Sequence, residues 1–221
     1  MSILPIDTGR YGTKEMLDIF REQKKIDYQL DIESAAALSQ SEIGLIPAFI
    51  AKNISKIAKS GKITAKRIKQ LEAKSDHDTA ALVEALAEKC NKKSRPWIHY
   101  GLTSNDLVDT SNSMQMRDAI KIIQPKVSKL SLLLAKNAVK HRSVPAVGRT
   151  HGQHASIISF GLKFANWASE MSTHLERLGE IKKRVLICRT LGVVGTGCLM
   201  GRNALKVQGR VAKRLSLYPA K

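Results

Sequence analysis

The sequence has few aromatic residues, few cysteines and no long apolar run. Aromatics make up 5% of the chain, and the long segments consist mainly of Ala, Leu, Lys, Glu, Gln and Met, which favour helix over strand. The three cysteines, Cys90, Cys188 and Cys198, form no CxxC pair, which argues against a zinc or redox centre and indicates buried thiols in a reducing compartment. No segment reaches the apolar length of a membrane span, and Met1–Asp7 does not resemble a signal peptide. We therefore expect an all-α, soluble and cytoplasmic protein without a metal ion.

Acidic residues are scarce in the second half of the chain. Lys and Arg number 37 against 19 acids, which gives a formal charge of +18. No acidic residue lies between Asp118 and Glu170 or after Glu180. Such a balance calls for an anionic partner, which could be nucleic acid, a polyanionic small substrate, or an acidic surface elsewhere in an assembly. A nucleic-acid-binding motif and interleaved aromatics are both missing, which makes nucleic acid the less favoured partner.

Apolar residues recur with helical spacing along most of the chain. The pattern predicts shorter helices over residues 14–44, 47–60, 64 onward, 79–89 and 204–217. It also predicts two long helices, one from Ser104 to about His141 and one from about His154 to about Leu186, joined by a non-helical link over Val144–Gly148. Two adjacent long helices cannot bury their apolar faces in so small a chain, so we expect partner helices from other subunits.

These patterns predict two domains. Residues 1–110 would form an N-terminal helical domain, and residues 111–221 would form the first long helices of a central helical bundle, which is incomplete because the chain is truncated.

Four short segments place polar, chemically versatile side chains at turns or helix starts. They are Arg10-Tyr11, Asp76–Asp78, His99–Asp106 and Gly148–Ala155. Helix N-termini carry backbone N–H groups and a positive dipole end, so these segments are suited to binding carboxylate or phosphate. Taken one at a time, each also has a structural explanation, since Ser, Thr and Asp are common helix caps and single histidines are common surface residues. The Gly192–Gly197 run lacks the Lys and Ser or Thr of a phosphate-binding loop.

Taken together, these segments resemble the adenylosuccinate lyase family, within the superfamily that includes fumarase and argininosuccinate lyase. The resemblance rests on the order and spacing of five stretches: Arg10–Met16, His77–Glu88, Trp97–Thr110, Gly148–Ala155 and Phe160–Lys163. The third and fourth stretches are shared widely in the superfamily. The first two point to the adenylosuccinate lyases in particular.

The resemblance implies an activity. Members of this family break a C–N bond and release fumarate, either from adenylosuccinate, giving AMP, or from the succinyl-carboxamide ribotide of purine nucleotide biosynthesis. It further implies a homotetramer whose sites draw residues from more than one subunit, and no cofactor.

The resemblance also assigns roles to residues near the leaving group and the phosphate. His151 would be the general acid that protonates the departing nitrogen, and Thr150 beside it would contact the substrate. Arg10 and Tyr11 would bind the nucleotide phosphate through a guanidinium and a hydroxyl. An imidazole suits the acid's role because its ordinary pKa is near neutrality.

Two further segments would hold the rest of the substrate. His77, flanked by Asp76 and Asp78, would be catalytic as a charged group that orients the substrate. Thr103 and Ser104 would bind a succinyl carboxylate through their hydroxyls and backbone N–H groups.

His99 and Asp106 would not contact the substrate but would hold the substrate-binding residues in place. The family's catalytic base is a Ser in a GSSxMPxKxN loop, and no such segment occurs in these 221 residues. We therefore expect the chain to represent the N-terminal half of such a lyase and to be inactive alone. The alternatives are another lyase of the superfamily, such as argininosuccinate lyase or a carboxymuconate cycloisomerase, or a noncatalytic basic helical protein that binds nucleic acid.

Overall fold

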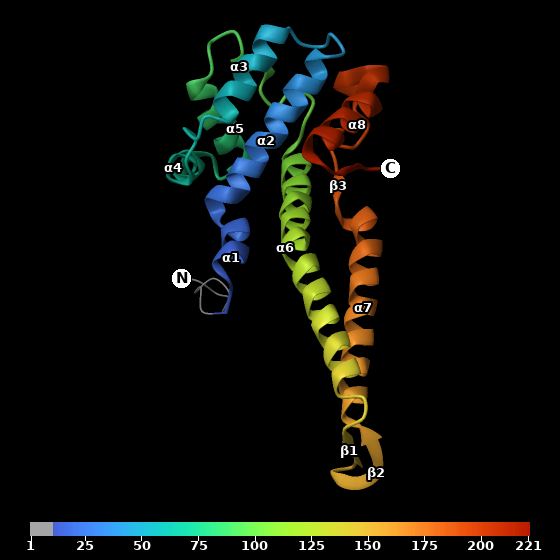
Figure 1. The fold of residues 1–221 in the computed structure, drawn as a ribbon. Helices are drawn as coiled ribbons and strands as arrows, with labels where there is room; N and C mark the ends of the chain where they lie inside the picture. The colour runs from blue at the N-terminus through green and yellow to red at the C-terminus, as the bar shows by residue number, and fades with distance from the viewer. Residues whose placement is uncertain (1–10) are drawn as a thin grey trace. The chain divides into compact units, whose positions relative to one another are not determined.

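The computed structural model describes residues 11–221 and is mostly helical, as the sequence predicts (Figure 1). The chain divides into two compact units. Unit 1 comprises the residues up to Asp118 together with Lys183–Lys221, and unit 2 comprises Ala119–Lys182. The predicted domain division near residue 110 stays a prediction. Among the described residues, no helix is long and apolar enough to cross a membrane.

Unit 1 is built from short helices packed around a central one. The helices of its first part are α1 (Lys14–Phe20), α2 (Glu22–Ser41), α3 (Ala48–Ala58), α4 (Ala65–Ser75), α5 (Asp78–Lys89) and the 3-10 helix η2 (Arg95–Trp97). The unit also contains the start of α6 (Ser104–Lys140), the strands β3 (Ile187–Cys188) and β4 (Tyr218–Pro219), η3 (Cys198–Asn203) and α8 (Ala204–Leu215). β3 and β4 pair in parallel.

The core of unit 1 surrounds α2. This helix contacts α3 and α8 as well as α1 and α4, and its small residues Ala35, Ala36 and Ala37 are all buried. A helix covered on several sides needs apolar or small residues all round, and any polar side chain within it needs a hydrogen-bond partner. Glu33 and Gln40 are such buried polar residues in α2.

The last helix, α8, packs its apolar face into the core beside α2, and its polar face forms ion pairs at the C-terminal end of α2. Val207 and Val211 of α8 are fully buried, whereas Arg210 and Arg214 on the polar side form ion pairs with Glu42. The helix ends at Leu215, two residues before the predicted end, because Ser216 takes a left-handed conformation with a φ of 55°.

Unit 2 is a long helical hairpin with a small β-hairpin at its tip (Figure 1). After α6 the chain forms the antiparallel strands β1 (Pro145–Thr150) and β2 (Gln153–Ser159) and then α7 (Phe160–Val185). The predicted start of the second long helix near His154 is therefore wrong. His151 and Gly152 have φ angles of 50° and 73°, and two consecutive positive φ angles make the tight turn that joins hairpin strands.

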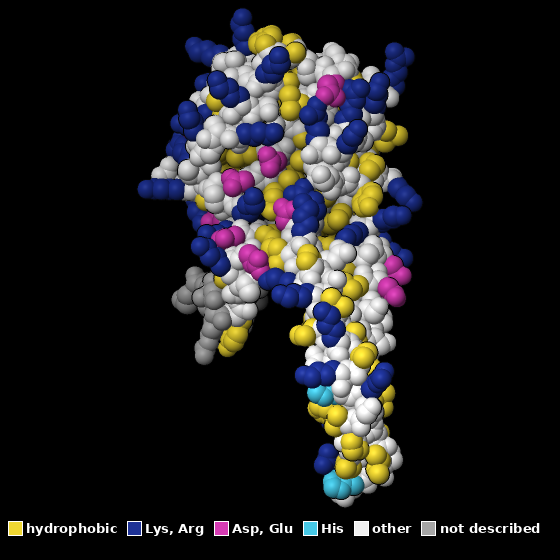
Figure 2. Space-filling view, in the orientation of Figure 1, with side chains coloured by type: hydrophobic (Ala, Val, Ile, Leu, Met, Phe, Trp, Pro, Cys, Tyr) yellow, Lys and Arg dark blue, Asp and Glu magenta, His cyan; other side chains and the backbone are white. Residues whose placement is uncertain are grey.

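Unit 2 buries very few of its own side chains. Among its residues only Ala119, Ile120 and Gly161 are buried. Figure 2 shows apolar side chains along the surface of the hairpin, and the large exposed ones are Ile123, Leu130, Leu132, Leu133, Val139, Val144, Val147, Ile157, Leu162, Trp167 and Ile181. The expectation that the two long helices leave apolar faces uncovered is confirmed. A hairpin of this kind gains little stability from its own contacts.

The close approach of α6 and α7 at Gly161 gives the first testable prediction. A Cβ atom at Gly161 would lie 2.4 Å from the backbone oxygen of Ala138, so we expect Gly161→Ala to lower the free energy of unfolding by about 1–3 kcal/mol through overpacking. A Cβ atom at Gly179, on the same helix, would meet only open space. Gly179→Ala should therefore raise stability by about 0.5–1 kcal/mol. Urea unfolding followed by circular dichroism measures both changes, and equal effects of the two substitutions would contradict the packing described.

Candidate functional site

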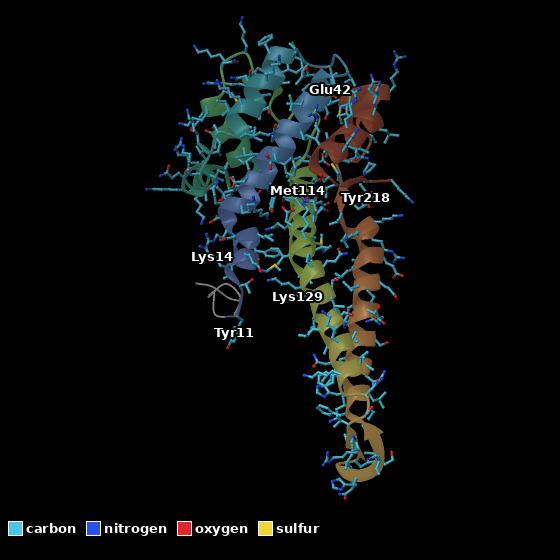
Figure 3. All side chains as sticks on the ribbon, viewed as in Figure 1. Tyr11, Lys14, Glu42, Met114, Lys129 and Tyr218 are labelled. Carbon is cyan, nitrogen blue, oxygen red and sulfur yellow. The ribbon has the colours of Figure 1, made fainter. Side chains whose placement is uncertain are left out.

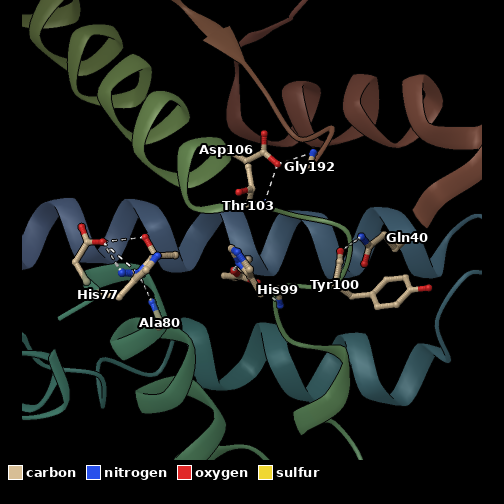
Figure 4. Close-up of polar contacts among 11 residues, drawn as sticks. Gln40, His77, Ala80, His99, Tyr100, Thr103, Asp106 and Gly192 are labelled. Atoms are coloured by element: carbon tan, nitrogen blue, oxygen red, sulfur yellow. Dashed lines mark hydrogen bonds and ion pairs between the residues drawn. The ribbon is translucent and has the colours of Figure 1, made fainter. Parts of the chain in front are cut away.

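Two of the polar segments singled out from the sequence meet in unit 1. The junction between α4 and α5 carries Asp76, His77 and Asp78, and the turn before α6 carries Thr103 and Ser104. Figure 4 shows the polar contacts that hold both segments. His77 and Ser104 line the same cavities, so the structure brings the two segments together.

At the α4–α5 junction, His77 caps a helix with its side chain. Its Nδ1 accepts a hydrogen bond from the backbone N–H of Ala80 at 3.2 Å, which satisfies one of the N–H groups at the start of α5. Asp76 ends α4 in a left-handed conformation, and the Asp78 carboxylate accepts the Thr79 N–H at 2.6 Å. The helix cap is therefore His77, not Asp78. Because Nδ1 accepts the Ala80 N–H, the ring nitrogen that could donate a hydrogen bond to a ligand is Nε2.

The second segment is a tight turn, His99–Thr103, which we call the His99 turn. His99 and Gly101 have φ angles of 59° and 72°. Three buried polar side chains hold its backbone, two from α2 and one from α6. Glu33 accepts the His99 N–H at 3.0 Å, Gln40 donates to the Tyr100 carbonyl at 2.7 Å, and Asp106 accepts the Thr103 N–H at 3.1 Å.

Asp106 also ties the His99 turn to a distant loop. The same carboxylate oxygen that accepts the Thr103 N–H accepts the N–H of Gly192 at 2.9 Å. Burial raises the pKa of Asp106, and the hydrogen bonds from the Gly192 and Thr103 backbones and the charge of Arg189 oppose that rise only in part. The Gly192–Gly197 loop thus contributes the Gly192 N–H to the hydrogen bonds that hold the His99 turn. The sequence pattern alone did not indicate this contact.

The side chain of His99 is held as firmly as its backbone. Its Nδ1 lies 2.6 Å from the second carboxylate oxygen of Glu33, whose side chain is 2% exposed. Burial lowers the pKa of His99, but the hydrogen bond and charge of Glu33, together with the charge of Asp106, outweigh it and raise the pKa above its ordinary value.

Two adjoining cavities border these segments, and their linings differ in charge. The inner cavity has a volume of about 250 Å³ and is lined by His77, His99, Thr103 and Ser104, with Thr79, Ala80, Val83 and Leu102. The outer cavity, of about 350 Å³, shares His77 and Ser104 but adds Glu72, Asp76 and Asp78. The inner cavity offers imidazoles and hydroxyls with no carboxylate in its lining, so it suits an anion better.

The remaining predicted residues lie elsewhere. Thr150 ends β1, and His151 is the first residue of the exposed two-residue turn in unit 2. Next to that turn, Arg149 and His154 face each other across the strands, with their side-chain nitrogens 3.2 Å apart. The structure places Thr150 and His151 side by side at an exposed turn, where an incoming ligand could reach them.

The predicted phosphate-binding pair lies at the beginning of the chain. Tyr11 precedes α1 and is 72% exposed, and Figure 3 shows its side chain directed away from that helix. Arg10 lies outside the described residues. The phosphate-binding role of this pair stays a prediction.

Glu33 and Gln40 are the residues of the site that the sequence motifs missed. Both lie in a helical pattern rich in alanine, far in sequence from the polar segments. The available signal was an acidic side chain within a run of apolar and small residues, because a buried carboxylate requires a partner.

Among the described residues, no group of three or more His, Cys, Asp or Glu side chains could hold a metal ion.

The two backbone contacts of Asp106 generate a stability prediction. Replacing it with alanine leaves the partly buried N–H groups of Thr103 and Gly192 without this acceptor, and we expect a loss of about 3 kcal/mol in the free energy of unfolding. Asp109, one helical turn further along α6, forms an exposed ion pair with Arg189, so Asp109→Ala should cost less than about 1 kcal/mol. Chemical denaturation of the two variants tests this difference, and a cost for Asp106→Ala no larger than for the control would refute it.

Comparisons with known proteins agree with the motifs and the fold. Residues 9–219 match the family described as Lyase. The adenylosuccinate lyase of Methanocaldococcus jannaschii is 43% identical over 99% of this chain and 47% of its own length. Among solved structures, a fumarate lyase from Mesorhizobium sp. BNC1 superimposes with a TM-score of 0.87 at 32% identity, over 93% of this chain and 48% of that one. The 3-carboxy-cis,cis-muconate lactonizing enzyme of Pseudomonas putida superimposes with a TM-score of 0.89 at 28% identity, over 96% of this chain and 49% of that one.

The chain spans about half the length of the relatives and solved structures it matches. The match to the family extends over nearly all of the 221 residues and includes both units and every polar segment described above. The chain therefore belongs to the lyase family, and its sequence is similar to that of adenylosuccinate lyases.

Proposed function

We propose that the protein to which this chain belongs is an adenylosuccinate lyase. It would eliminate fumarate from adenylosuccinate, giving AMP, and from the succinyl-carboxamide ribotide of purine biosynthesis. The observation that carries the proposal is the inner cavity, where His77, from a stretch typical of adenylosuccinate lyases, meets Thr103 and Ser104, from a stretch shared across the superfamily. The 43% identity to an adenylosuccinate lyase supports the choice of substrate.

The elimination requires three chemical functions, and the inner cavity is suited to stabilising the negative charge. A base must remove a proton next to a carboxylate, cationic or N–H groups must stabilise the charge that develops on that carboxylate, and an acid must protonate the leaving nitrogen. Thr103 and Ser104 would bind a succinyl carboxylate at the start of α6, and His77 would donate a hydrogen bond from Nε2. Asp76 and Asp78, which line the outer cavity, would then act by keeping the His77 segment in place.

His151 would be the acid, and Thr150 beside it would contact the substrate. Its place in an exposed turn supports this role, because a proton donor must reach the leaving group of a bound ligand. Arg10 and Tyr11 would bind the phosphate. The base would be the Ser of the loop that these 221 residues do not contain, so the residues present would supply the anion-binding and acid functions.

The uncovered hairpin of unit 2 supports a homo-oligomer, which we propose to be a tetramer. Its apolar side chains lie along both long helices, a distribution that suits burial in a multi-helix bundle more than contact with a single flat surface. A second copy of the same hairpin supplies a matching apolar face.

A substitution on this face tests the assembly. Leu133 on α6 is 56% exposed in the single chain, and we expect Leu133→Glu to shift the protein from an oligomer to a monomer, since burying an unpaired carboxylate in an interface is costly. Lys136→Glu, at an exposed basic position of the same helix, should leave the oligomer intact. Light scattering coupled to size-exclusion chromatography reads out the mass. A monomeric unsubstituted chain, or an oligomer that tolerates Leu133→Glu, would argue against assembly through this hairpin.

The second candidate is the cyclisation catalysed by a muconate lactonizing enzyme, and the fold similarity to the Pseudomonas putida enzyme favours it. Its substrate carries carboxylates but no phosphate. The phosphate-binding role proposed for Arg10 and Tyr11 would have no counterpart in that reaction, and this favours the nucleotide substrate.

A chimera with a relative tests the proposed reaction. The present chain would replace the matching residues of the Methanocaldococcus jannaschii enzyme, and the ultraviolet change that accompanies loss of fumarate from adenylosuccinate would be followed. We expect turnover by the chimera and none by the 221 residues alone. His151→Gln in the chimera should reduce the rate by at least about 100-fold, the usual contribution of a general acid.

The controls separate chemistry from folding. His174, an exposed histidine on α7, is outside the proposed site, so His174→Gln should leave the rate unchanged. Turnover of carboxymuconate in place of adenylosuccinate would select the second candidate, and turnover of adenylosuccinate undiminished by His151→Gln would remove His151 from the mechanism.

A further inference from the structure

We propose that Glu33 is a positioning residue of the anion site: it holds His99 so that the ring carries a proton on Nδ1 and directs Nε2 to the inner cavity. This inference deepens the proposed function, on which it rests for the identity of the bound anion. The effect of Glu33 on the His99 ring does not depend on which anion is bound.

Both polar contacts of the Glu33 side chain are made with His99. One carboxylate oxygen accepts the His99 backbone N–H at 3.0 Å, and the other lies 2.6 Å from Nδ1 of the same residue. His99 has a φ of 59°, in the left-handed region that residues with a side chain rarely adopt. The two contacts together select this backbone conformation and the orientation of the ring.

The carboxylate also determines where the ring carries its proton. An ionised carboxylate only accepts hydrogen bonds, so the Nδ1 that contacts it must bear the hydrogen. When His99 is neutral, its Nε2 is then an acceptor. When His99 is charged, Nε2 becomes a donor, and the ring, which lines the inner cavity, can bind an anion there.

The neighbouring imidazole has the opposite arrangement. The Nδ1 of His77 accepts the Ala80 N–H, so the nitrogen of that ring left to donate to a ligand is Nε2. The inner cavity therefore combines the Nε2 donor of His77 with the ring of His99, whose Nε2 donates only when that ring is protonated. An oxyanion such as a carboxylate would receive both donors when His99 is charged.

Two carboxylates favour the charged form of His99. Burial lowers the pKa of His99, but Glu33 on α2 and Asp106 on α6 raise it by more. His77, at the start of α5, lines the same cavity. Protonated His99 therefore persists to higher pH than an ordinary histidine. The stability that its protonation contributes is fully present below its ordinary pKa and is lost as pH rises through the raised value.

The test follows the six histidines by nuclear magnetic resonance in the full chain labelled with ¹⁵N-histidine. His99→Gln assigns the His99 signals. We expect the neutral ring of His99 to carry its hydrogen on Nδ1, and Glu33→Gln to lower the titration midpoint of His99 by about one to three pH units, the usual effect of removing an adjacent opposite charge.

Glu88→Gln is the matched control. Glu88 is an exposed glutamate on α5 that pairs with Arg67, so its replacement should leave the His99 midpoint unchanged. If Glu33→Gln does not fold, the unsubstituted chain still tests the proposal, because its spectrum shows whether the neutral His99 ring carries its hydrogen on Nδ1. A neutral His99 with its hydrogen on Nε2, or an unchanged midpoint in folded Glu33→Gln, would overturn the proposal.

Titration with fumarate separates this inference from the proposed function. At about pH 6, fumarate should shift the His99 and His77 signals of the unsubstituted chain, and Glu33→Gln should weaken fumarate binding at least about tenfold near pH 7, while Glu88→Gln should not. Unchanged fumarate affinity in folded Glu33→Gln would overturn the link between Glu33 and the anion. If the Nδ1 hydrogen and the midpoint shift are observed but fumarate moves neither ring, the positioning role of Glu33 stands and the proposed function fails.

Discussion

The His99 turn is the constraint on which the candidate site depends. Its backbone enters the interior of unit 1 just before α6, where each N–H and carbonyl group must find a partner. Glu33, Gln40 and Asp106 provide three of those partners, and Asp106 extends the same network to Gly192. The position of Thr103 and Ser104 therefore depends on side chains buried in α2 and α6, not on the exposed residues around the cavity.

The helices of this fold could be predicted from the sequence, whereas the β-hairpin could not be read from periodicity. Regular apolar spacing located α3, α5 and the start of α6, because those helices bury one face. Residues 153–159 continue an apolar pattern that suits helix and strand equally, and the deciding feature is the His151-Gly152 turn. An X-Gly pair between β-branched segments was the available signal.

The motifs located the cavity but not what supports it. His77 and Ser104 were identifiable because they occur at helix starts, where side chains and backbone N–H groups are accessible to a ligand. Glu33 and Gln40 were not, because their partners lie about 60 residues away and a helical pattern carries no information about such distant contacts. The role of a residue like Glu33 emerges only when the fold brings α2 against the turn.

Both the charge and the exposed hairpin support the proposal that this chain is part of a larger assembly. We propose that the polar segments of unit 1 bind anions and that His151 of unit 2 supplies the acid of a lyase reaction. Amide hydrogen exchange of the chimera, with and without AMP plus fumarate, tests that claim most directly. The account predicts increased protection at three separate segments, residues 76–80, 99–104 and 149–154, on ligand addition. Protection confined to other parts of the chain, or unchanged exchange at saturating ligand, would contradict it.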